Sequence, residues 1–372
     1  MSDKFQAVVI GGGPGGYVCA IRLAQLGLKT ACIESRGSLG GTCLNVGCIP
    51  SKNLLNISEN YHKAQNFSKL GIEVGEVKLN LEKMMKNKDK AVTVLTKGVE
   101  FLFKKNKITY FKGTGSFKSA NKISILDDQK KEIIIETEKT VISTGSTPVE
   151  LPGMEFDEKI IVSSTGALTL KTVPKKMIVV GGGYIGLEMA EMFLSRGIEV
   201  TFLVREDRFW GGVLPKKEGE LISRHIKKHH VDLRFETELQ EIIGDENGRA
   251  KSIITKSGEV IECQFVGLTA GVSPNIDFIK ESNIETNRGI LVNKFLETNV
   301  PNVYALGDCA EFHKHPTGRK NLEQVWYTGR MMGETLAQTI CDNKTPYKPG
   351  MWFNSAKFFD IEYQTYGSVF SE

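Results

Sequence analysis

Two cysteines, Cys43 and Cys48, stand close together in the segment GGTCLNVGCIPSK, which runs from Gly40 to Lys52. Such thiols can carry two electrons by forming and breaking a disulfide, which needs their Cα atoms within about 7 Å. A regular helix separates residues five apart by roughly 7.5 Å, so the bridge requires a bent turn, which the glycines permit. If a helix begins at Ile49, its N-terminus favours a thiolate at Cys48. The pattern favours a reactive pair over the alternative, two unpaired cysteines buried in a glycine-rich loop.

A glycine-rich turn before the cysteines has the pattern of a dinucleotide-binding site. The apolar strand Ala7–Ile10 leads into G-x-G-x-x-G and then an amphipathic helix. The motif glycines are Gly11, Gly13 and Gly16. They suit a tight turn, close approach to a pyrophosphate and packing of helix on strand. The next predicted strand, Lys29–Ile33, is followed by Glu34, at the spacing of an acid that binds a ribose hydroxyl.

The same unit occurs a second time. Strand Met177–Val180 leads into another G-x-G-x-x-G, helix Leu187–Ser195 and strand Glu199–Leu203. Its glycines are Gly181, Gly183 and Gly186. A chain with two dinucleotide units is expected to pass electrons between them, and FAD with a nicotinamide cofactor is the natural pair.

The two units differ where the ribose acid is expected. Glu34 follows Gly16 by eighteen residues (34 − 16), and the same spacing from Gly186 gives Val204, followed by Arg205. An arginine there can bind the extra phosphate of NADP, so we expect the chain to accept NADP(H). In the alternative interpretation Arg205 is merely exposed and Glu206 turns inward.

The pattern predicts an α/β fold with two Rossmann-like dinucleotide-binding domains in three layers, the FAD domain being discontinuous in sequence. Helices are expected at 53–69, 81–105 and 323–340, and short strands between 108 and 142. Prolines and glycines after Ser146 suggest a domain boundary. The predicted domains are 1–148 (FAD, first segment, with the redox cysteines), 149–272 (NAD(P)), 273–345 (FAD, second segment) and an aromatic tail at 346–372, which covers a core edge or begins a further domain.

The composition is that of a globular protein. The net charge of +4 over 372 residues gives no reason to expect nucleic acid as a partner. The N-terminus lacks the features of a signal peptide and no apolar run has the length of a membrane span, so we expect a cytoplasmic protein without a membrane partner. The remaining cysteines are interpreted as small core residues or bystanders: Cys19, Cys32, Cys263, Cys309 and Cys341. No metal site is predicted.

These motifs together resemble the flavin-dependent pyridine nucleotide-disulfide oxidoreductases. VVIGGGPGGYVCAIRLAQLG and GGTCLNVGCIPSK are most similar to the dihydrolipoamide dehydrogenase branch, and VVGGGYIGLEMA and YALGDCA extend the resemblance. From about Phe209 onward the sequence is more similar to the smaller FAD/NAD(P)H reductases, including modules of nitrite reductase type.

The resemblance implies roles for matching positions. Cys43 would meet the substrate disulfide, and Cys48 would face the flavin. Lys52 would lie near the flavin ring, paired with Glu188, although an ordinary surface ion pair is the alternative. FAD would be bound by Gly11, Gly13, Gly16, Glu34, Gly41, Thr42, Lys52, Thr144, Gly145 and Asp308. The NAD(P) site would include Gly181, Gly183, Gly186, Glu188, Arg205 and Gly271.

The resemblance also implies partners. The substrate would be a small disulfide or dithiol, or a lipoyl-bearing protein. Homodimers are typical of the family, but the C-terminal dimerisation domain, which carries a His–Glu pair, is not recognised in this sequence. The segment His313–Thr317 resembles the family's His-containing motif only superficially, and we interpret it as a loop with a coincidental His-Pro. Two alternatives remain: an NAD(P)H-dependent reductase of a small redox protein, of nitrite-reductase-module or ferredoxin-reductase type with auxiliary cysteines, and a flavin redox sensor.

Overall fold

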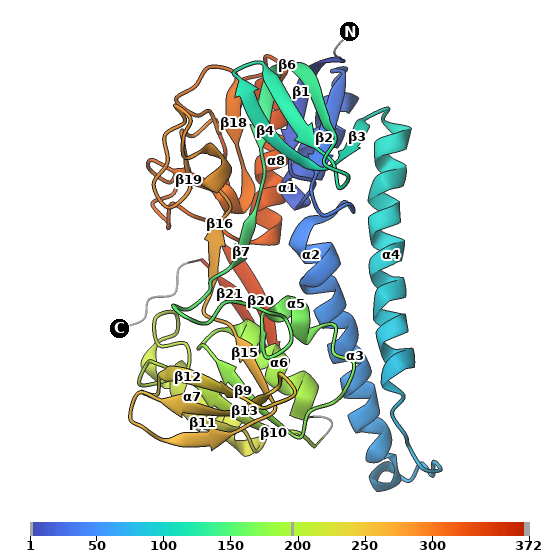
Figure 1. Ribbon diagram of the computed structural model, residues 1–372, viewed down its shortest axis with the longest axis vertical. Helices are drawn as coiled ribbons and strands as arrows, with labels where there is room; N and C mark the ends of the chain where they lie inside the picture. The colour runs from blue at the N-terminus through green and yellow to red at the C-terminus, as the bar shows by residue number, and fades with distance from the viewer. Residues whose placement is uncertain (1–2, 195–196, 368–372) are drawn as a thin grey trace. The chain divides into compact units, whose positions relative to one another are not determined.

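The computed structural model describes residues 3–194 and 197–367, drawn in Figure 1. These residues form two compact units, each assembled from three segments of the chain. Unit 1 comprises the described residues of 1–49, 91–147 and 273–350. Unit 2 comprises the described residues of 50–90, 148–272 and 351–372.

Unit 1 is built on a parallel sheet whose strands run in the order β3-β2-β1-β6-β18. The strands are β1 (Lys4–Ile10), β2 (Thr30–Glu34), β3 (Thr109–Lys112), β6 (Glu132–Ile142) and β18 (Val303–Ala305). In register, Val9 of β1 stands between Cys32 and Val141. The apolar run of β1 is explained by this central place, because both faces of a central parallel strand are covered.

The two faces of this sheet pack against different layers. Ala7 and Val9 belong to a core shared with helices, whereas Val8 and Ile10 belong to a core shared with Ile123 of an antiparallel layer. That layer pairs β4 (Thr114–Ser119), β5 (Lys122–Leu126) and the first half of β6. Unit 1 therefore has the three layers that the sequence predicted. A small sheet, β17 (Ile290–Val292) with β19 (Ala310–Phe312), completes it.

Helices α1 (Pro14–Gln25) and α8 (Trp326–Ile340) lie side by side on the helical face (Figure 1). Glycine makes this contact possible, because a Cβ on Gly333 would lie 2.5 Å from the carbonyl oxygen of Gly15. The other helical elements before unit 2's sheet are α2 (Gly41–Val46), α3 (Cys48–Gln65), η1 (Phe67–Leu70) and α4 (Leu81–Lys105). Val99 and Phe103 of α4 join the core of unit 1.

Unit 2 contains a second parallel sheet, in the order β11-β10-β9-β15-β8. Its strands are β8 (Ile161–Val162), β9 (Lys176–Val180), β10 (Glu199–Leu203), β11 (Asp232–Arg234) and β15 (Phe265–Leu268). Its helices are α5 (Ser164–Ala167), α6 (Tyr184–Leu194) and α7 (Lys216–Lys228). The opposite face carries the antiparallel strands β12 (Leu239–Gly244), β13 (Ala250–Thr255) and β14 (Val260–Glu262).

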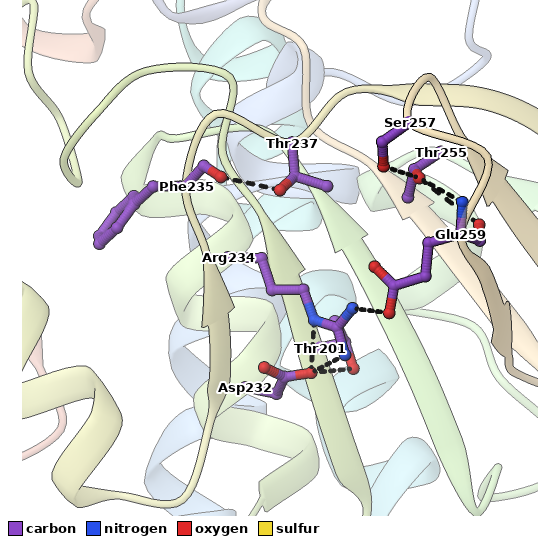
Figure 2. Close-up of polar contacts among 8 residues, drawn as sticks. All are labelled: Thr201, Asp232, Arg234, Phe235, Thr237, Thr255, Ser257 and Glu259. Carbon is purple, nitrogen blue, oxygen red and sulfur yellow. Dashed lines mark hydrogen bonds and ion pairs between the residues drawn. The ribbon is translucent and has the colours of Figure 1, made fainter.

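Figure 2 shows how the two sheets of unit 2 are connected at one edge. Arg234 at the end of β11 donates to Asp232 on its own strand and to Glu259 in the turn before β14, at 2.8 and 2.5 Å. Asp232 also accepts from Thr201 of β10. The guanidinium thus links the edge of the parallel sheet to the antiparallel layer.

The C-terminal segment forms a hairpin of β20 (Phe353–Phe358) and β21 (Ile361–Tyr366) that packs against α6. Phe359 is 8% exposed and joins the core of unit 2, with Ile361 and Tyr363 packed beside it. The aromatic tail therefore covers a core edge, one of its two predicted roles. The remaining elements are β7 (Ser146–Pro148), β16 (Val272–Pro274), η2 (Asp277–Ile279) and η3 (Gly307–Cys309).

Several predicted elements are confirmed and some were missed. Helix α4 has the predicted bounds, and α8 begins three residues later than expected (326 − 323). Ser195, predicted to end α6, lies outside the described residues. Helix α7 was not predicted, although Ile222 and Ile226 bury one of its faces. Among the described residues, no helix is long and apolar enough to cross a bilayer.

The division into units differs from the predicted domains at several places, two of which involve long segments. Residues 50–90 and 351–372 pack within unit 2. Residues 50–90 pack within unit 2 because of apolar contacts. Leu54 of α3 and Met84 of α4 form a buried cluster with Leu168.

Substituting Gly333→Ala should destabilise unit 1 by about 1–3 kcal/mol, because the added methyl group meets backbone atoms that cannot move aside. Gly98→Ala is the matched control: Gly98 lies inside α4 with open space around it, so alanine should stabilise the helix by about 0.5–1 kcal/mol. Urea unfolding followed by circular dichroism measures both. Equal midpoints for the two variants would contradict the close contact of α1 with α8.

Candidate active site

The first glycine turn packs backbone against backbone at the end of the parallel sheet, which leaves no room for side chains at two of its glycines. Gly11 has φ +105°, and a Cβ there would lie 2.1 Å from the carbonyl oxygen of Ser143. A Cβ on Gly16 would lie 1.9 Å from the carbonyl oxygen of Gly11. Helix α1 follows with Gly13 as its N-cap and no side-chain capping bond. Its first N–H groups are therefore available to an anion such as a pyrophosphate.

Glu34 ends β2 beside this turn. Its side chain is buried, Oε2 accepts from the N–H of Gly12 at 2.9 Å, and Oε1 accepts from the N–H of Arg36 at 2.8 Å. These bonds hold the carboxylate against the glycine turn, and each oxygen keeps a lone pair for a further donor. A ribose hydroxyl would be such a donor, so the role expected for Glu34 is compatible with this geometry and stays a prediction.

The cysteine segment reaches the same turn through Gly41. Gly41 has φ +58°, and a Cβ on it would lie 2.6 Å from the Cα of Gly13. Helix α2 starts at Gly41 and contains Thr42 and Cys43. The two glycine-rich segments are thus in direct backbone contact.

A break separates the two cysteines. Helix α2 ends at Val46, and Gly47 takes φ −137° and ψ −115° before α3 begins at Cys48. A Cβ on Gly47 would lie 3.0 Å from the carbonyl oxygen of Thr42. The bend that a Cys43–Cys48 bridge requires is therefore present. Ile49 is helical, so the condition for placing Cys48 at a helix N-terminus is met, although α3 begins five residues (53 − 48) before the helix predicted at 53–69. Both cysteines are thiols here.

The surroundings of Cys43 keep its thiol protonated. A hydrogen bond with the side chain of Cys48 raises the pKa of Cys43, and burial and the nearby charge of Asp308 raise it further. The interaction with Cys48 shows that the two thiol groups are neighbours. In the reduced pair, the thiol proton therefore stays on Cys43, whose S–H group is hydrogen-bonded to the sulfur of Cys48.

The remaining predicted FAD residues of unit 1 lie at two neighbouring strand ends. Thr144 and Gly145 follow β6, and Asn275 holds them: it donates to the carbonyl oxygen of Thr144 at 3.0 Å and accepts from the Thr144 hydroxyl at 2.7 Å through its own carbonyl. Asp308 follows β18, accepts from Ser146 at 2.7 Å, and has its pKa raised by burial. The carboxyl ends of β1, β2, β6 and β18 thus gather the predicted residues at one edge of the sheet, the place where open parallel sheets bind ligands. The backbone cradle, the acid and the uncapped helix fit FAD.

Unit 2 repeats the cradle with one difference. Gly181 has φ +127°, and a Cβ on it would lie 2.4 Å from the carbonyl oxygen of Thr269. A Cβ on Gly186 would lie 2.8 Å from the Thr269 hydroxyl, and Gly183 faces open space. Gly271 has φ +111° and also faces open space, while its carbonyl accepts from Val149 at 3.0 Å.

The difference concerns the ribose acid. Oε2 of Glu206 lies 3.4 Å from the position of a Cβ on Gly182, much as Oε2 of Glu34 lies 3.2 Å from that of Gly12. The side chain of Arg205 is 75% exposed and pairs with Glu206 at 3.0 Å. This arrangement corresponds to the alternative interpretation, in which Glu206 turns inward. The acid is present in the sequence, but it lies two residues further from its glycine motif than Glu34 does, because Val204 and Arg205 separate it from the end of β10.

The predicted pair of Lys52 with Glu188 is present within unit 2. Ser51 also donates to Glu188, at 2.7 Å, and the glutamate side chain is 12% exposed against 59% for Lys52. The pair therefore differs from an ordinary surface ion pair, because its glutamate is mostly buried and has a second hydrogen-bond donor. The role of Lys52 beside a flavin stays a prediction.

Other charged groups line a pocket of about 410 Å³ in unit 2, between α3, α6 and the C-terminal hairpin. Hydrogen bonds from Lys357 and then Lys63 lower the pKa of Glu59 to about 2. Burial raises the pKa of Glu191 to about 7, although its carboxylate accepts from the N–H of Phe359 at 3.0 Å. These acids were not singled out in the sequence, where nothing distinguishes them from surface charge.

The segment His313–Thr317 is a loop, as interpreted, yet one of its histidines is part of a buried network. His315 has a fully buried side chain 3.3 Å from Glu323, and Glu323 also contacts Arg319 and accepts from the Tyr347 hydroxyl at 3.2 Å. The network explains the conformation of the loop.

The chain belongs to the pyridine nucleotide-disulphide oxidoreductase family, whose pattern matches residues 5–333. It is 44% identical over 319 residues to dihydrolipoyl dehydrogenase 1, mitochondrial, of Arabidopsis thaliana, an alignment covering 82% of this chain and 62% of that protein. It is 43% identical over 321 residues to leghemoglobin reductase of Glycine max, covering 82% and 60%. The chain thus spans about three-fifths of the length of these plant relatives.

A solved structure has a similar fold. It is a Cu(II) complex of a mutant of the HOCl-induced flavoprotein disulfide reductase RclA from Escherichia coli, with a TM-score of 0.83 and 23% identity, covering 99% of this chain and 78% of that one. The likeness confirms the predicted α/β fold with two dinucleotide-binding domains. The family match confirms the resemblance found in the motifs.

Gly41→Ala should reduce the FAD content of the purified protein at least tenfold, because the methyl group would occupy the contact with Gly13 that shapes the cradle. Gly27→Ala is the control, since Gly27 also has a positive φ, +97°, but faces open space. Flavin absorbance per chain measures the effect. Equal flavin content in the two variants would show that the contact is not needed for binding.

Glu191→Gln should change how stability depends on pH. A carboxyl whose folded pKa is raised to about 7 binds its proton more tightly in the native state, so the free energy of unfolding falls as pH rises from 4.5 through 7. The glutamine amide keeps the acceptor for Phe359 and carries no charge. We expect no difference near pH 4.5 and a gain of about 1–2 kcal/mol at pH 8, after allowing for solvent screening. Urea unfolding at both pH values tests this expectation. Glu220→Gln, at an exposed position, is the control for the loss of one charge. An equal gain in stability at both pH values would contradict the raised pKa of Glu191.

Proposed function

We propose that this protein is an FAD-dependent disulfide oxidoreductase that uses NAD(H), with Cys43 and Cys48 as its redox pair. The proposed substrate is a dihydrolipoyl group, free or carried on a protein. The balanced reaction is dithiol + NAD⁺ ⇌ disulfide + NADH + H⁺. Similarity to dihydrolipoyl dehydrogenases at 44% identity supports the substrate class.

The observation that carries the proposal is the backbone contact of Gly13 with Gly41. It joins the pyrophosphate turn to the first residue of α2, two residues before Cys43. The charge of Asp308, at the end of β18, also acts on Cys43. These contacts support the proposal that the residues suited to hold FAD and the cysteine pair act as one site in unit 1, because an accidental pair of thiols would not need such contacts.

The chain's own groups perform the exchange as follows. In the oxidised pair, a substrate thiolate attacks the sulfur of Cys43, and the Cys43–Cys48 bond breaks in favour of a mixed disulfide. The second substrate thiol then displaces Cys43, so the substrate becomes a disulfide and the pair becomes a dithiol holding two electrons. Cys43 leaves with the electron pair of the broken bond and takes up the proton that the second substrate thiol releases, because its pKa is raised. FAD, when bound, supplies the two-electron carrier between this dithiol and the nicotinamide.

A second function has support from one comparison. Leghemoglobin reductase of Glycine max is as similar to this chain as the dihydrolipoyl dehydrogenases are, at 43% identity. A reductase that passes electrons from NADH to a protein acceptor would use the FAD site of unit 1 without requiring the cysteine pair.

The double variant Cys43→Ser, Cys48→Ser separates the two functions. With NAD⁺ and dihydrolipoamide we expect loss of turnover by at least a thousandfold, because the disulfide that accepts the electrons is removed, whereas NADH-to-dye turnover should remain within a few-fold. Gly98→Ala serves as the unrelated control. Undiminished dihydrolipoamide oxidation would refute the proposed role of the pair, and undiminished reduction of a haem protein would favour the second function.

Glu206 should make the protein prefer NADH. A carboxylate beside the turn accepts from a ribose hydroxyl and repels a phosphate in that position. Glu206→Gln should lower the ratio of kcat/KM for NADH to that for NADPH by about 10–100-fold, the worth of a charged hydrogen bond. Arg205→Gln, an exposed neighbour, should change the ratio less than threefold. A wild-type preference for NADPH would show that Arg205 governs the site instead.

A further inference from the structure

Two histidines, one in the last turn of α7 and one at its C-cap, are placed for joint binding. His225 and His229 are four residues apart, the spacing that brings side chains together on a helix. Their ring centroids are 4.7 Å apart. The side chain of His225 is 14% exposed and that of His229 is 35% exposed, so both rings are sheltered but reachable.

A carboxylate from a distant part of the sequence meets both rings. Asp360 lies in the turn between β20 and β21, and its Oδ1 contacts Nε2 of His225 and lies 3.1 Å from Nε2 of His229. The three ligand atoms all lie within 4.8 Å of one another. In a tetrahedral zinc site with bonds of about 2.0–2.1 Å, ligand atoms are roughly 3.3 Å apart, so small movements would bring these three to a common ion.

The turn that carries Asp360 is held in place by its neighbour. The N–H of Phe359 donates to Glu191 of α6 at 3.0 Å, and the Phe359 ring stacks on the ring of His229 at 4.3 Å with an interplanar angle of 5°. Phe359 is also buried in the core of unit 2. The carboxylate and the imidazoles are thus oriented by packing and a second layer of contacts, the arrangement that metal sites require.

The carboxylate is the neighbour of a buried ring nitrogen. Nε2 of His225 is buried and lies against Oδ1 of Asp360, but the two atoms do not form a hydrogen bond of acceptable geometry. A cation bound between the two imidazoles and the carboxylate would serve this nitrogen and the carboxylate together.

We infer that His225, His229 and Asp360 bind a divalent first-row transition ion of the Zn²⁺ type through two imidazole nitrogens and one carboxylate oxygen. Two imidazoles select such ions over Mg²⁺ and Ca²⁺, which prefer oxygen ligands. A fourth position is left for water. The ion would join α7 to the C-terminal hairpin, two elements of unit 2 that are far apart in sequence. The site is separate from the cysteine pair and independent of the proposed function.

The test is Zn²⁺ binding to the full chain, measured by competition with a chromophoric chelator at pH 7.5. Cys43→Ser, Cys48→Ser is the parent for all variants, because the two thiols would otherwise bind zinc themselves. His225→Gln, His229→Gln and Asp360→Asn should each weaken binding of a single ion by at least about 10–100-fold. His230→Asn is the matched control, since this adjacent histidine is exposed and lies outside the cluster. Equal affinity in His225→Gln and His230→Asn, or no binding by the parent, would overturn the inference.

Two further readouts on the parent keep the test decisive if a variant misfolds. Co²⁺ bound at this site should absorb visible light more strongly than the hexaaqua ion, and Zn²⁺ should slow hydrogen exchange of the β20–β21 amides relative to those of β12–β13. An aqueous-like Co²⁺ spectrum, or equal protection of the two hairpins, would count against the site.

Discussion

Unit 1 depends on backbone segments that meet where no side chain could fit. Gly11 lies against Ser143, and Gly13 lies against Gly41. These contacts bring the ends of β1 and β6 and the start of α2 to one place. Because glycine alone tolerates both the positive φ at Gly11 and Gly41 and the short distances, the site is set by backbone geometry before any reactive side chain is considered. The thiols, the acid at the end of β2 and the hydroxyl groups are the reactive and hydrogen-bonding groups that this backbone arrangement positions.

The sequence predicted the parts of the fold that depend on local spacing. The two glycine motifs, the strands that precede them and helix α4 follow from short patterns, and the structure has them where expected. The bend at Gly47 could also be foreseen, because two cysteines five apart cannot be bridged on a regular helix. Those predictions succeeded because each rests on residues within one or two turns of chain.

Features set by distant packing could not be predicted in the same way. Glu206 faces its glycine turn because two residues, Val204 and Arg205, lie between the end of β10 and the acid. The fixed spacing used for the first unit gave Val204, with Arg205 next to it. The assignment of residues 50–90 to unit 2 follows from Leu54 and Met84 meeting Leu168. The buried network around His315 depends on Tyr347, and the meeting of α7 with Asp360 depends on the hairpin. None of these pairs is close in sequence.

Both units are interleaved along the chain, and this has a consequence for biosynthesis. The parallel sheet of unit 1 lacks β18 and the covering helix α8 until the ribosome has passed residue 340. Unit 2 lacks the hairpin that contributes Phe359 to its core until residue 366. Neither unit can close its core as the first half of the polypeptide emerges. Native structure must therefore be reached late, with β1, β2 and β9 exposing apolar faces during translation, a state in which chaperones commonly hold nascent chains.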